Sequence, residues 1–366
     1  SALPSIKTYN SPTALWVGVP NTNATGIKAT DGYMVFIRGD RTVSTISASP
    51  TKTVLRTKGD LYTGDQTPIP VAANLFASIG NPYPSAIDMR NITKTGARDF
   101  FYLWDPALAG SYGYGAYQTF SNDGSGNYVI TPGDGSYGAS GTISNYIASG
   151  QAFFVQGDAG GGSLTFKEAA KTTGGGVASV AAGLPTPQLR ANLYGVTTDS
   201  STYMADGVLI NYDDSYSNNV DDMDAIKLTN TSENLAIKTA GKLLVIERRH
   251  TITSQDTVFL NLTGVRTQKY RFELMTDQLY HPGLTGFLED NYLHTRTPLG
   301  IDGNTDVDFT VTSAAGSYVP DRFRIVFTPP FALPLTFTSV KAYQQGTHIN
   351  VEWNVDNELN MKQYEV

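Results

Sequence analysis

Short apolar runs, alternating or continuous and bounded by Gly, Pro, Asn and Asp, recur along the whole chain. In the first half, GYMVFIRG (32–39) alternates large and small residues, and FFYLWDP (100–106) is an aromatic run ended by Asp-Pro. Runs of this length between turn residues predict β-strands. AFFVQG (152–157) and SLTFKE (163–168) predict a hairpin closed by DAGGG, and TKTVLRTKGDLYTG (51–64) predicts a second hairpin around Gly-Asp.

The second half continues the pattern with eight further runs, which are LRANLYGV, DGVLINYD, KLLVIERR, DTVFLNLTGV, KYRFELM, GFLEDNYL, VDFTVTS and RFRIVFTPP. Such regular spacing is typical of an antiparallel sandwich or jelly roll. Long periodic runs of Ala, Glu, Lys and Leu, which favour helices, do not occur. The sequence therefore predicts an all-β protein built from tandem antiparallel β-sandwich, jelly-roll-like domains.

Changes in composition divide the chain into four segments. Residues 1–170 are expected to form a first β-sandwich module, and residues 190–331 a second, jelly-roll-like one. Between them, 171–189 (KTTGGGVASVAAGLPTPQL) is typical of a linker, because three glycines loosen it and two prolines stiffen its exit. Residues 332–366 supply two strands around Gln-Gln-Gly, too few for an independent domain. We expect an incomplete C-terminal β unit there, or a strand segment exchanged with a neighbouring molecule.

Charge and composition narrow the function classes. The net charge is −7 with an isoelectric point near 5.1, so the basic surface expected of a nucleic-acid-binding protein is missing. Cysteine is absent, which excludes disulfides, thiolate metal sites and a cysteine nucleophile. No apolar run approaches the roughly 20 residues that span a bilayer. The start, SALPSIKTYN, lacks the pattern of a signal peptide, so we expect a cytosolic chain or an exported one after processing.

The stretch IGNPYPSAID (79–88) concentrates two prolines just after a strand-like run. Each proline removes a backbone donor and restricts the residue before it to extended geometry. The pattern predicts a rigid turn that directs the strand out of its sheet, tied down by Asn81 and Asp88 and covered by Tyr83. We interpret it as scaffold without chemistry.

Several collinear stretches carry a resemblance to a known group of proteins. They are GYMVFIRGDR, IGNPYPSAID, FFYLWDP followed by GAYQTF, YIASGQAFFVQ and LTFKEAAK. Together they resemble a β-rich module of very large surface and secreted proteins of Bacteroidetes, exported by the type IX secretion system. The closing LPLTFTSVKAYQQGTHINVEWNVDNELNMKQYEV resembles the opening of the sorting region of such proteins. In relatives further strands precede PSIKTYN, so the first module is expected to lack upstream strands here.

Residues for catalysis do not form a recognisable pattern. The histidines His250, His281, His294 and His348 are scattered, without H-x-H or H-E-x-x-H spacing. No G-x-S-x-G nucleophile elbow occurs, and no spacing among the acidic residues singles out a catalytic pair. We therefore predict that the chain is not an enzyme and holds no organic cofactor.

Two acidic stretches could hold structural Ca²⁺. The first, DGNTDVD, places oxygen ligands at alternate positions, namely Asp302, Asn304, Asp306 and Asp308. An EF-hand loop would have Gly where Val307 stands and Glu where Ser313 stands, and a polar hairpin turn explains the same pattern. The second, YDDSYSNNVDDMD, contains Asp213, Asp214, Asp221, Asp222 and Asp224. These carboxylates repel one another unless they are solvated, paired with cations or bridged by a metal, and we favour solvation.

Two further features bear on partners. Tyr112, Tyr114 and Tyr117 lie in the Tyr/Gly-rich stretch 109–141 and could stack on sugar rings, although packing under their own loop explains them as well. Thr257 in DTV resembles the Asp-Ser/Thr-aliphatic pattern of O-glycosylation in Bacteroidetes.

The resemblance and these features lead to two function hypotheses. We predict a non-catalytic structural or adhesive protein on the surface of a Gram-negative bacterium, a subunit of an extracellular fibre if terminal strands add to neighbouring copies. Its partners would be copies of itself or neighbouring modules of a larger surface protein. The alternative is a glycan-binding module, or part of a glycan-processing enzyme, that uses the stretch 109–141.

Overall fold

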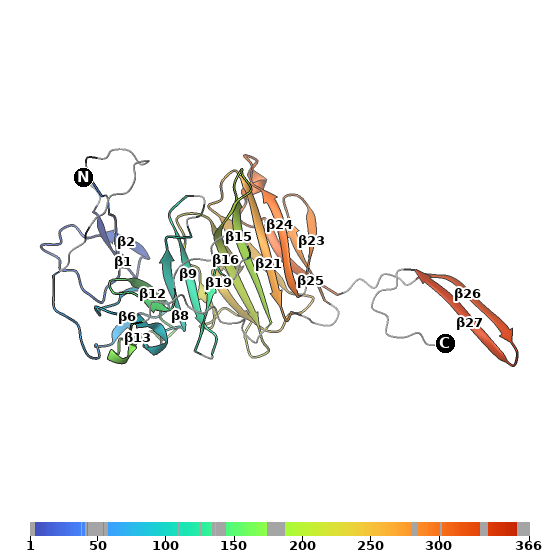
Figure 1. Cartoon of the computed structure of the whole chain (residues 1–366), viewed down its shortest axis with the longest axis horizontal. Helices are drawn as coiled ribbons and strands as arrows, with labels where there is room; N and C mark the ends of the chain where they lie inside the picture. Colours follow the sequence, from blue (N-terminus) through green and yellow to red (C-terminus); the bar gives the residue numbers. More distant parts are fainter. Residues whose placement is uncertain are drawn as a thin grey trace.

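The chain folds into a row of β-sheets that ends in a separate hairpin (Figure 1). The computed structural model describes residues 4–37, 39–40, 42, 54, 58–108, 110, 112–124, 126–133, 136, 144–173, 187–279, 284–300, 302–329 and 336–356. In these residues the helices are short 3-10 turns, namely η1 (Met89–Asn91), η2 (Glu168–Ala170) and η3 (Ala315–Tyr318). None is long or apolar enough to cross a membrane.

The first β unit is a sandwich. One layer is a five-stranded sheet of, in spatial order, β10 (Tyr128–Thr131), β9 (Ala116–Asn122), β8 (Phe100–Asp105), β12 (Ala152–Gln156) and β5 (Phe76–Gly80). The other layer combines β11 (Tyr146–Ile147), β6 (Ala86–Asp88) and β14 (Lys171–Thr172) with β4 (Ile69–Val71), β13 (Gly162–Thr165) and β7 (Thr93–Thr95). Phe101, Phe120, Phe153 and Leu164 are buried between the layers.

A small three-stranded sheet precedes this sandwich. Its strands, in spatial order, are β2 (Leu15–Gly18), β1 (Ile6–Asn10) and β3 (Tyr33–Val35). Tyr9 and Trp16 on one face of the sheet lie edge-on against Phe154 of β12, with ring centroids 4.9 and 5.8 Å from it. The sheet is therefore attached to the first unit by aromatic side chains.

The second β unit is one large, strongly curved sheet of eleven strands. Ten follow one another in space as β23 (Thr295–Leu299), β22 (Thr285–Asp290), β25 (Phe323–Thr328), β20 (Thr257–Thr263), β18 (Asn234–Thr239), β19 (Lys242–Arg249), β16 (Thr202–Tyr212), β15 (Gln188–Val196), β21 (Lys269–Asp277) and β24 (Gly303–Thr310), while β17 (Ala225–Ile226) pairs with β19. The end strands β23 and β24 approach each other, so the sheet nearly closes around its core.

Alternation along the strands explains how the two units join. In β16, Val208 and Ile210 point into the core of the curved sheet, while Leu209 between them faces the first unit. In β8, Phe100 and Tyr102 likewise leave the first unit's own core and pack in the cluster that contains Leu209. Because these strands are buried on both faces, they have continuous apolar sequences instead of alternating ones.

The last element is a hairpin of β26 (Thr336–Gln345) and β27 (His348–Asp356) around Gly346, whose φ of 65° needs the left-handed region. Each strand packs mainly on the other, and Figure 1 shows the hairpin extending away from the rest of the protein. The predicted pair of strands around Gln-Gln-Gly is therefore confirmed.

The all-β, sandwich-based prediction is confirmed, with differences in how strands pair. All eight runs predicted in the second half are strands, but β16 and β19 pair in parallel. The predicted 152–168 hairpin is wrong, because β12 pairs with β5 and β8 while β13 crosses to the opposite layer. The stretch 109–141 contains β9 as well as the one strand expected there.

Two predicted segments fall partly outside the described residues. In the predicted hairpin 51–64 the described part, 54 and 58–64, forms no strand. Of the predicted linker 171–189, residues 174–186 are outside the described part, whereas its two ends belong to β14 and β15. The first unit thus extends to Thr172, because β14 pairs with β6.

The turn in IGNPYPSAID is the scaffold that the sequence predicts. The Asn81 side chain, 5% exposed, donates to the carbonyls of Ser85 and Ile147 at 2.8 and 3.1 Å and accepts from the Tyr83 backbone N–H at 3.0 Å. The Tyr83 ring is buried, and its hydroxyl donates to the Gly64 carbonyl at 2.7 Å. The turn therefore connects three separate segments of the first unit.

Candidate functional site

The acidic stretch 213–224 contacts the first unit through Arg98. The Arg98 guanidinium donates to the backbone carbonyls of Asp221 and Asp224 at 3.1 and 2.8 Å, and its Nη2 lies 2.9 Å from the Asp222 carboxylate. The Arg98 side chain is only 6% exposed, whereas that of Asp222 is 43% exposed. One arginine of the first unit thus joins a loop of the second.

Asp224 is the buried member of this stretch, at 1% exposure. Its carboxylate accepts from the backbone N–H groups of Arg248 and Asp221 at 2.8 and 2.9 Å. Burial disfavours the charged form and raises the pKa of Asp224 to about 6, although the two N–H donors act in the opposite direction. Asp224 therefore titrates close to neutral pH at the contact between the two units.

The other carboxylates of the stretch point to separate partners. Asp213 accepts from the backbone N–H and hydroxyl of Ser215, Asp214 from the Thr251 hydroxyl, and Asp221 from the Met223 N–H. Each of the five carboxylates thus has a partner of its own, which is a nearby backbone N–H, a hydroxyl or a cationic side chain. Solvation, the favoured explanation, accounts for the exposed members only, because Asp224 is buried.

The first calcium candidate forms part of an extended strand. Asn304, Asp306 and Asp308 share the outward face of β24 at every second residue, and Asp302 precedes the strand. Residues two apart along a strand are about 7 Å apart, so the expected convergence on one ion does not occur. Lys269 and Arg271 of β21 bind Asp308 at 2.7 and 2.6 Å, and the Arg271 hydrogen bond is the main cause that lowers the Asp308 pKa to about 2.

Across the described ranges, no group of three or more His, Asp or Glu side chains has an arrangement that could hold a metal ion. For the two candidate calcium stretches, the sequence pattern was correct in finding carboxylates close along the chain. In the first stretch the extended strand separates the carboxylates, and in the second the carboxylates accept hydrogen bonds from different donors.

The three candidate tyrosines do not form one surface. Tyr112 and Tyr114 stack at a centroid distance of 6.3 Å with 27° between the rings, and the Arg266 guanidinium lies 3.6 Å from the Tyr112 centroid. Tyr114 is 64% exposed. Tyr117 is half-buried and packs edge-on against Trp104, and this burial raises its pKa. The candidate glycan-binding surface therefore consists of Tyr112, Tyr114 and Arg266, and Tyr117 is not part of it.

Thr257, the O-glycosylation candidate, is the first residue of β20 and half-buried. The preceding Asp256 accepts from the backbone N–H of Thr253 and from its hydroxyl at 2.6 and 2.8 Å, and also binds Arg249. The aspartate of the motif thus closes a turn before the strand. Glycosylation of Thr257 stays a prediction.

The described histidines do not meet one another. His250 lies 3.7 Å from the carboxylate of Asp214, His294 sits in the turn after β22 with a φ of 56°, and His348 begins β27. His281 lies outside the described residues. The arrangement offers no paired base and nucleophile among the histidines that are described.

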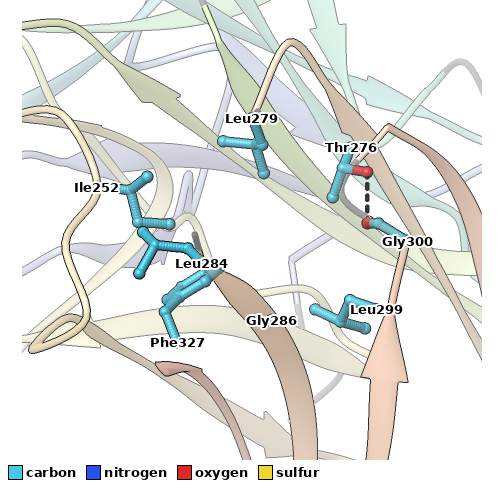
Figure 2. A pocket seen from close by; sticks show the side chains of 8 residues that line it. All are labelled: Ile252, Thr276, Leu279, Leu284, Gly286, Leu299, Gly300 and Phe327. Carbon is cyan, nitrogen blue, oxygen red and sulfur yellow. Dashed lines mark hydrogen bonds between the residues drawn. The ribbon is translucent and has the colours of Figure 1, made fainter. Parts of the chain in front are cut away.

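In the described part of the chain, a small cavity lies inside the curved sheet between β21, β22 and β25 (Figure 2). Leucine, isoleucine and phenylalanine side chains line most of it, and the Thr276 hydroxyl, which also faces it, donates to the Gly300 carbonyl at 2.8 Å. Its volume of about 10 Å³ is near the minimum for one water molecule. The cavity is a packing gap in the core and is too small for a substrate.

The sequence did not reveal the arginines that join the units. Besides Arg98, Arg248 donates to the Ser121 hydroxyl and the Asn122 carbonyl at 2.9 and 3.2 Å, and Arg190 to the Ile130 carbonyl at 2.8 Å. Their position inside or beside strand-like runs is the one available signal, because a charge on a strand buried on both faces needs a partner.

Both β units fall within the match to one protein family. A family model described as "Domain of unknown function (DUF8693)" matches residues 22–327. The chain belongs to this family. The DUF8693 match includes both β units and the segment between them, whereas β1, β2 and the hairpin β26–β27 lie outside it. No curated protein and no solved structure matches the chain.

Proposed function

We propose that the chain is a non-catalytic, secreted structural or adhesive protein of a bacterial cell surface, built to hold its shape. The observation that carries this proposal is the contact between the two units. Phe100, Tyr102 and Phe154 of the first unit share a buried cluster with Leu209 and Val245 of the second. A shared apolar cluster with arginine bonds around it makes the two units one stiff body without disulfides.

Further support comes from the candidate chemistry and from the resemblance. The described histidines are dispersed, and the cavity in the second unit has a volume of only about 10 Å³, near the minimum for one water molecule. The resemblance to type IX-exported modules of Bacteroidetes points to the outside of a Gram-negative cell. We propose copies of the same chain, or neighbouring modules of a larger surface protein, as its partners.

The location is tested by treating intact cells of the producing bacterium with a protease that cannot enter them. We expect an epitope on the second β unit to be lost from intact cells, while a cytosolic control protein stays intact. Recovery of the whole protein in the cytosolic fraction would contradict the proposal. A strain lacking the gene is expected to adhere less to abiotic surfaces or to form fewer surface fibres.

A second candidate function is glycan binding at Tyr112 and Tyr114. The specific observation is that the Arg266 guanidinium covers one side of the Tyr112 ring, while Tyr114 is 64% exposed. Two aromatic rings held in place by a neighbouring guanidinium can pack against the apolar face of a pyranose. On a glycan array, hits that disappear with Tyr114→Ala and persist with Tyr62→Ala would support this function. An array without hits would remove it.

A further inference from the structure

Lys227 and Asp206 form a deeply buried pair inside the second β unit. Lys227 Nζ lies 2.5 Å from Asp206 Oδ1, and the two side chains are 5% and 0% exposed. In every other lysine–carboxylate pair of the described residues, at least one side chain is about half exposed. Removing two charges from water is costly, and their attraction does not always offset that cost. The pair therefore needs an explanation beyond surface charge.

The backbone directs both side chains to the same point from different segments. Asp206 lies at a bulge in β16, where the pairing with β15 passes from Met204 to Asp206 and skips Ala205. A bulge of this kind redirects a side chain. Lys227 directly follows β17, and its backbone N–H donates to the Leu243 carbonyl of β19 at 2.9 Å. The sheet thus holds the amine and the carboxyl group against each other.

The carboxyl group of Asp206 has more hydrogen bonds than the amine. Oδ1 accepts from Lys227 Nζ and from the Gly207 N–H, and Oδ2 accepts from the Leu235 N–H at 2.7 Å. An ammonium group has three donors, but in the described part of the chain Asp206 is its one acceptor. Burial raises the pKa of the Asp206 carboxyl, although Lys227 acts in the opposite direction. Transfer of one proton from Nζ to Oδ1 removes both buried charges.

We propose that Lys227 and Asp206 condense in the folded protein to form an intramolecular isopeptide bond between Nζ and the carboxyl carbon of Asp206. Two groups are positioned to react when the reacting atoms are about 3–3.5 Å apart. Nζ lies 2.5 Å from Oδ1, and the carboxyl carbon is one bond further, so the amine is within reach of it.

The reaction balances without an oxidant, a reductant or another reactant. The neutral amine attacks the carbon of the protonated carboxyl group, which forms the C–N bond and places negative charge on Oδ2. A second proton then moves from Nζ to Oδ1, the C–Oδ1 bond breaks, and Oδ1 leaves as water with the bonding electron pair. Oδ2 becomes the carbonyl oxygen of an amide that keeps one N–H.

The surroundings of Asp206 favour this step. The Leu235 N–H, 2.7 Å from Oδ2, is placed to stabilise the negative charge that develops on this oxygen. Complete burial of the carboxyl group excludes the water that would reverse the reaction. The pair of Lys238 and Asp321 brings the same groups to 2.8 Å, but these side chains are 44% and 60% exposed. We expect that pair to remain an ion pair.

The bond closes the loop that contacts Arg98. Asp206 and Lys227 are 21 positions apart, and the acidic stretch 213–224 lies between them. A covalent link across such a loop stabilises a protein mainly by restricting its unfolded chain. In a chain without cysteine, the isopeptide bond supplies a covalent closure next to the loop that joins the two β units.

Mass spectrometry of the intact, denatured 366-residue chain tests the bond. We expect the wild type to be lighter than its sequence by one water molecule, and its digest to contain a branched peptide that joins Lys227 to Asp206. Asp206→Asn should form the same bond with loss of ammonia in place of water. Lys227→Arg should have the full mass of its sequence, because a guanidinium is not deprotonated. Lys238 and Asp321 are the matched control within the same digest and should be unlinked.

Two results would overturn the inference. The first is a wild-type chain with the full mass of its sequence. The second is a loss of water that persists in Lys227→Arg, because Asp206 precedes Gly207 and can also lose water by forming a cyclic imide with the Gly207 nitrogen. The branched peptide of the wild type decides between the two products even if a variant fails to fold. The mass of the chain does not depend on its location in the cell, so failure here is distinguishable from failure of the proposed function.

Discussion

Replacing Arg98 by alanine is expected to weaken the junction between the two β units more than any exposed arginine would. The side chain is 6% exposed and reaches the loop 221–224 with two hydrogen bonds to backbone carbonyls and one ion pair. In the Arg98→Ala variant the carbonyls of Asp221 and Asp224 lose their charged donor, and a gap replaces the buried stem.

The magnitude follows from these contacts. A hydrogen bond that involves a charged group contributes about 1.5–3 kcal/mol, and an ion pair as exposed as that to Asp222 adds at most about 1 kcal/mol. The contacts are not additive, so the loss in free energy of unfolding is about 3–5 kcal/mol, the range for breaking a buried pair. Against a typical total of about 5–15 kcal/mol, this is a large fraction.

Urea denaturation followed by tryptophan fluorescence and circular dichroism measures the effect. The three tryptophans lie outside the second unit: Trp104 is in the first unit, Trp16 is in the sheet packed on it, and Trp353 is in the C-terminal hairpin. Fluorescence therefore follows mainly the first unit, whereas the secondary-structure signal includes both units. We expect a lower midpoint for Arg98→Ala and separation of the two signals, because weakly coupled units unfold independently. The matched control is Arg90→Ala, which removes an arginine that pairs with Asp88 and has a side chain 42% exposed. If Arg98→Ala costs no more than Arg90→Ala, the junction does not depend on Arg98.

Three further predictions concern other parts of the structure. Burial raises the pKa of Asp224 to about 6 in the folded state. The protonated Asp224 side chain therefore contributes to the free energy of unfolding fully below about pH 4, and this contribution is lost as the pH rises through 6. Asp224→Asn is expected to flatten the dependence of the melting temperature on pH between these two values. Asn81→Ala should lower the free energy of unfolding by about 2–3 kcal/mol, because a buried amide with several partners is lost, and Asn91→Ala, an exposed change nearby, should leave it nearly unchanged. Millimolar calcium is expected to leave the melting temperature unchanged, because Lys269 and Arg271 already bind the Asp308 carboxylate. A rise in the melting temperature with calcium would show that the folded protein binds the ion and would contradict this expectation.

The sequence predicted strands best where burial leaves a local pattern. Phe100–Asp105 is a continuous apolar run because the strand is covered on both faces, and that run is visible without any structure. β23 gave no such signal, because its residues Thr295–Leu299 are largely exposed and include a proline. A strand can thus be predicted from its own sequence where one or both of its faces are apolar.

Strand pairing could not be predicted in the same way. β12 and β13 are neighbours along the chain with a glycine-rich connection, which is also how a hairpin looks. Their separation into different layers depends on the apolar side chains that each strand offers to the common core, such as Phe153 and Leu164. A local turn pattern contains no information about that choice.

The candidate site shows the same limit for polar residues. The aspartates of 213–224 were recognised as a cluster, but their partner Arg98 lies more than 120 positions away in the sequence. An arginine before an aromatic run has no local signature of burial. The O-glycosylation pattern at Thr257 is similar, because its Asp256 has a structural use that the motif alone does not reveal.

The junction is distinctive in using arginine against backbone carbonyls. Arg98, Arg190 and Arg248 each donate across the boundary to at least one main-chain oxygen. A guanidinium has five donors in a fixed plane, so it can bind carbonyls of a facing loop or strand end without a matched acidic side chain. Such bonds fix the orientation of the two units relative to each other. The apolar cluster around Leu209 constrains this orientation less, because hydrophobic contact is not directional. In a chain without cysteine, these bonds hold the two units in a fixed orientation, which is why the loss of one buried arginine is expected to destabilise both units.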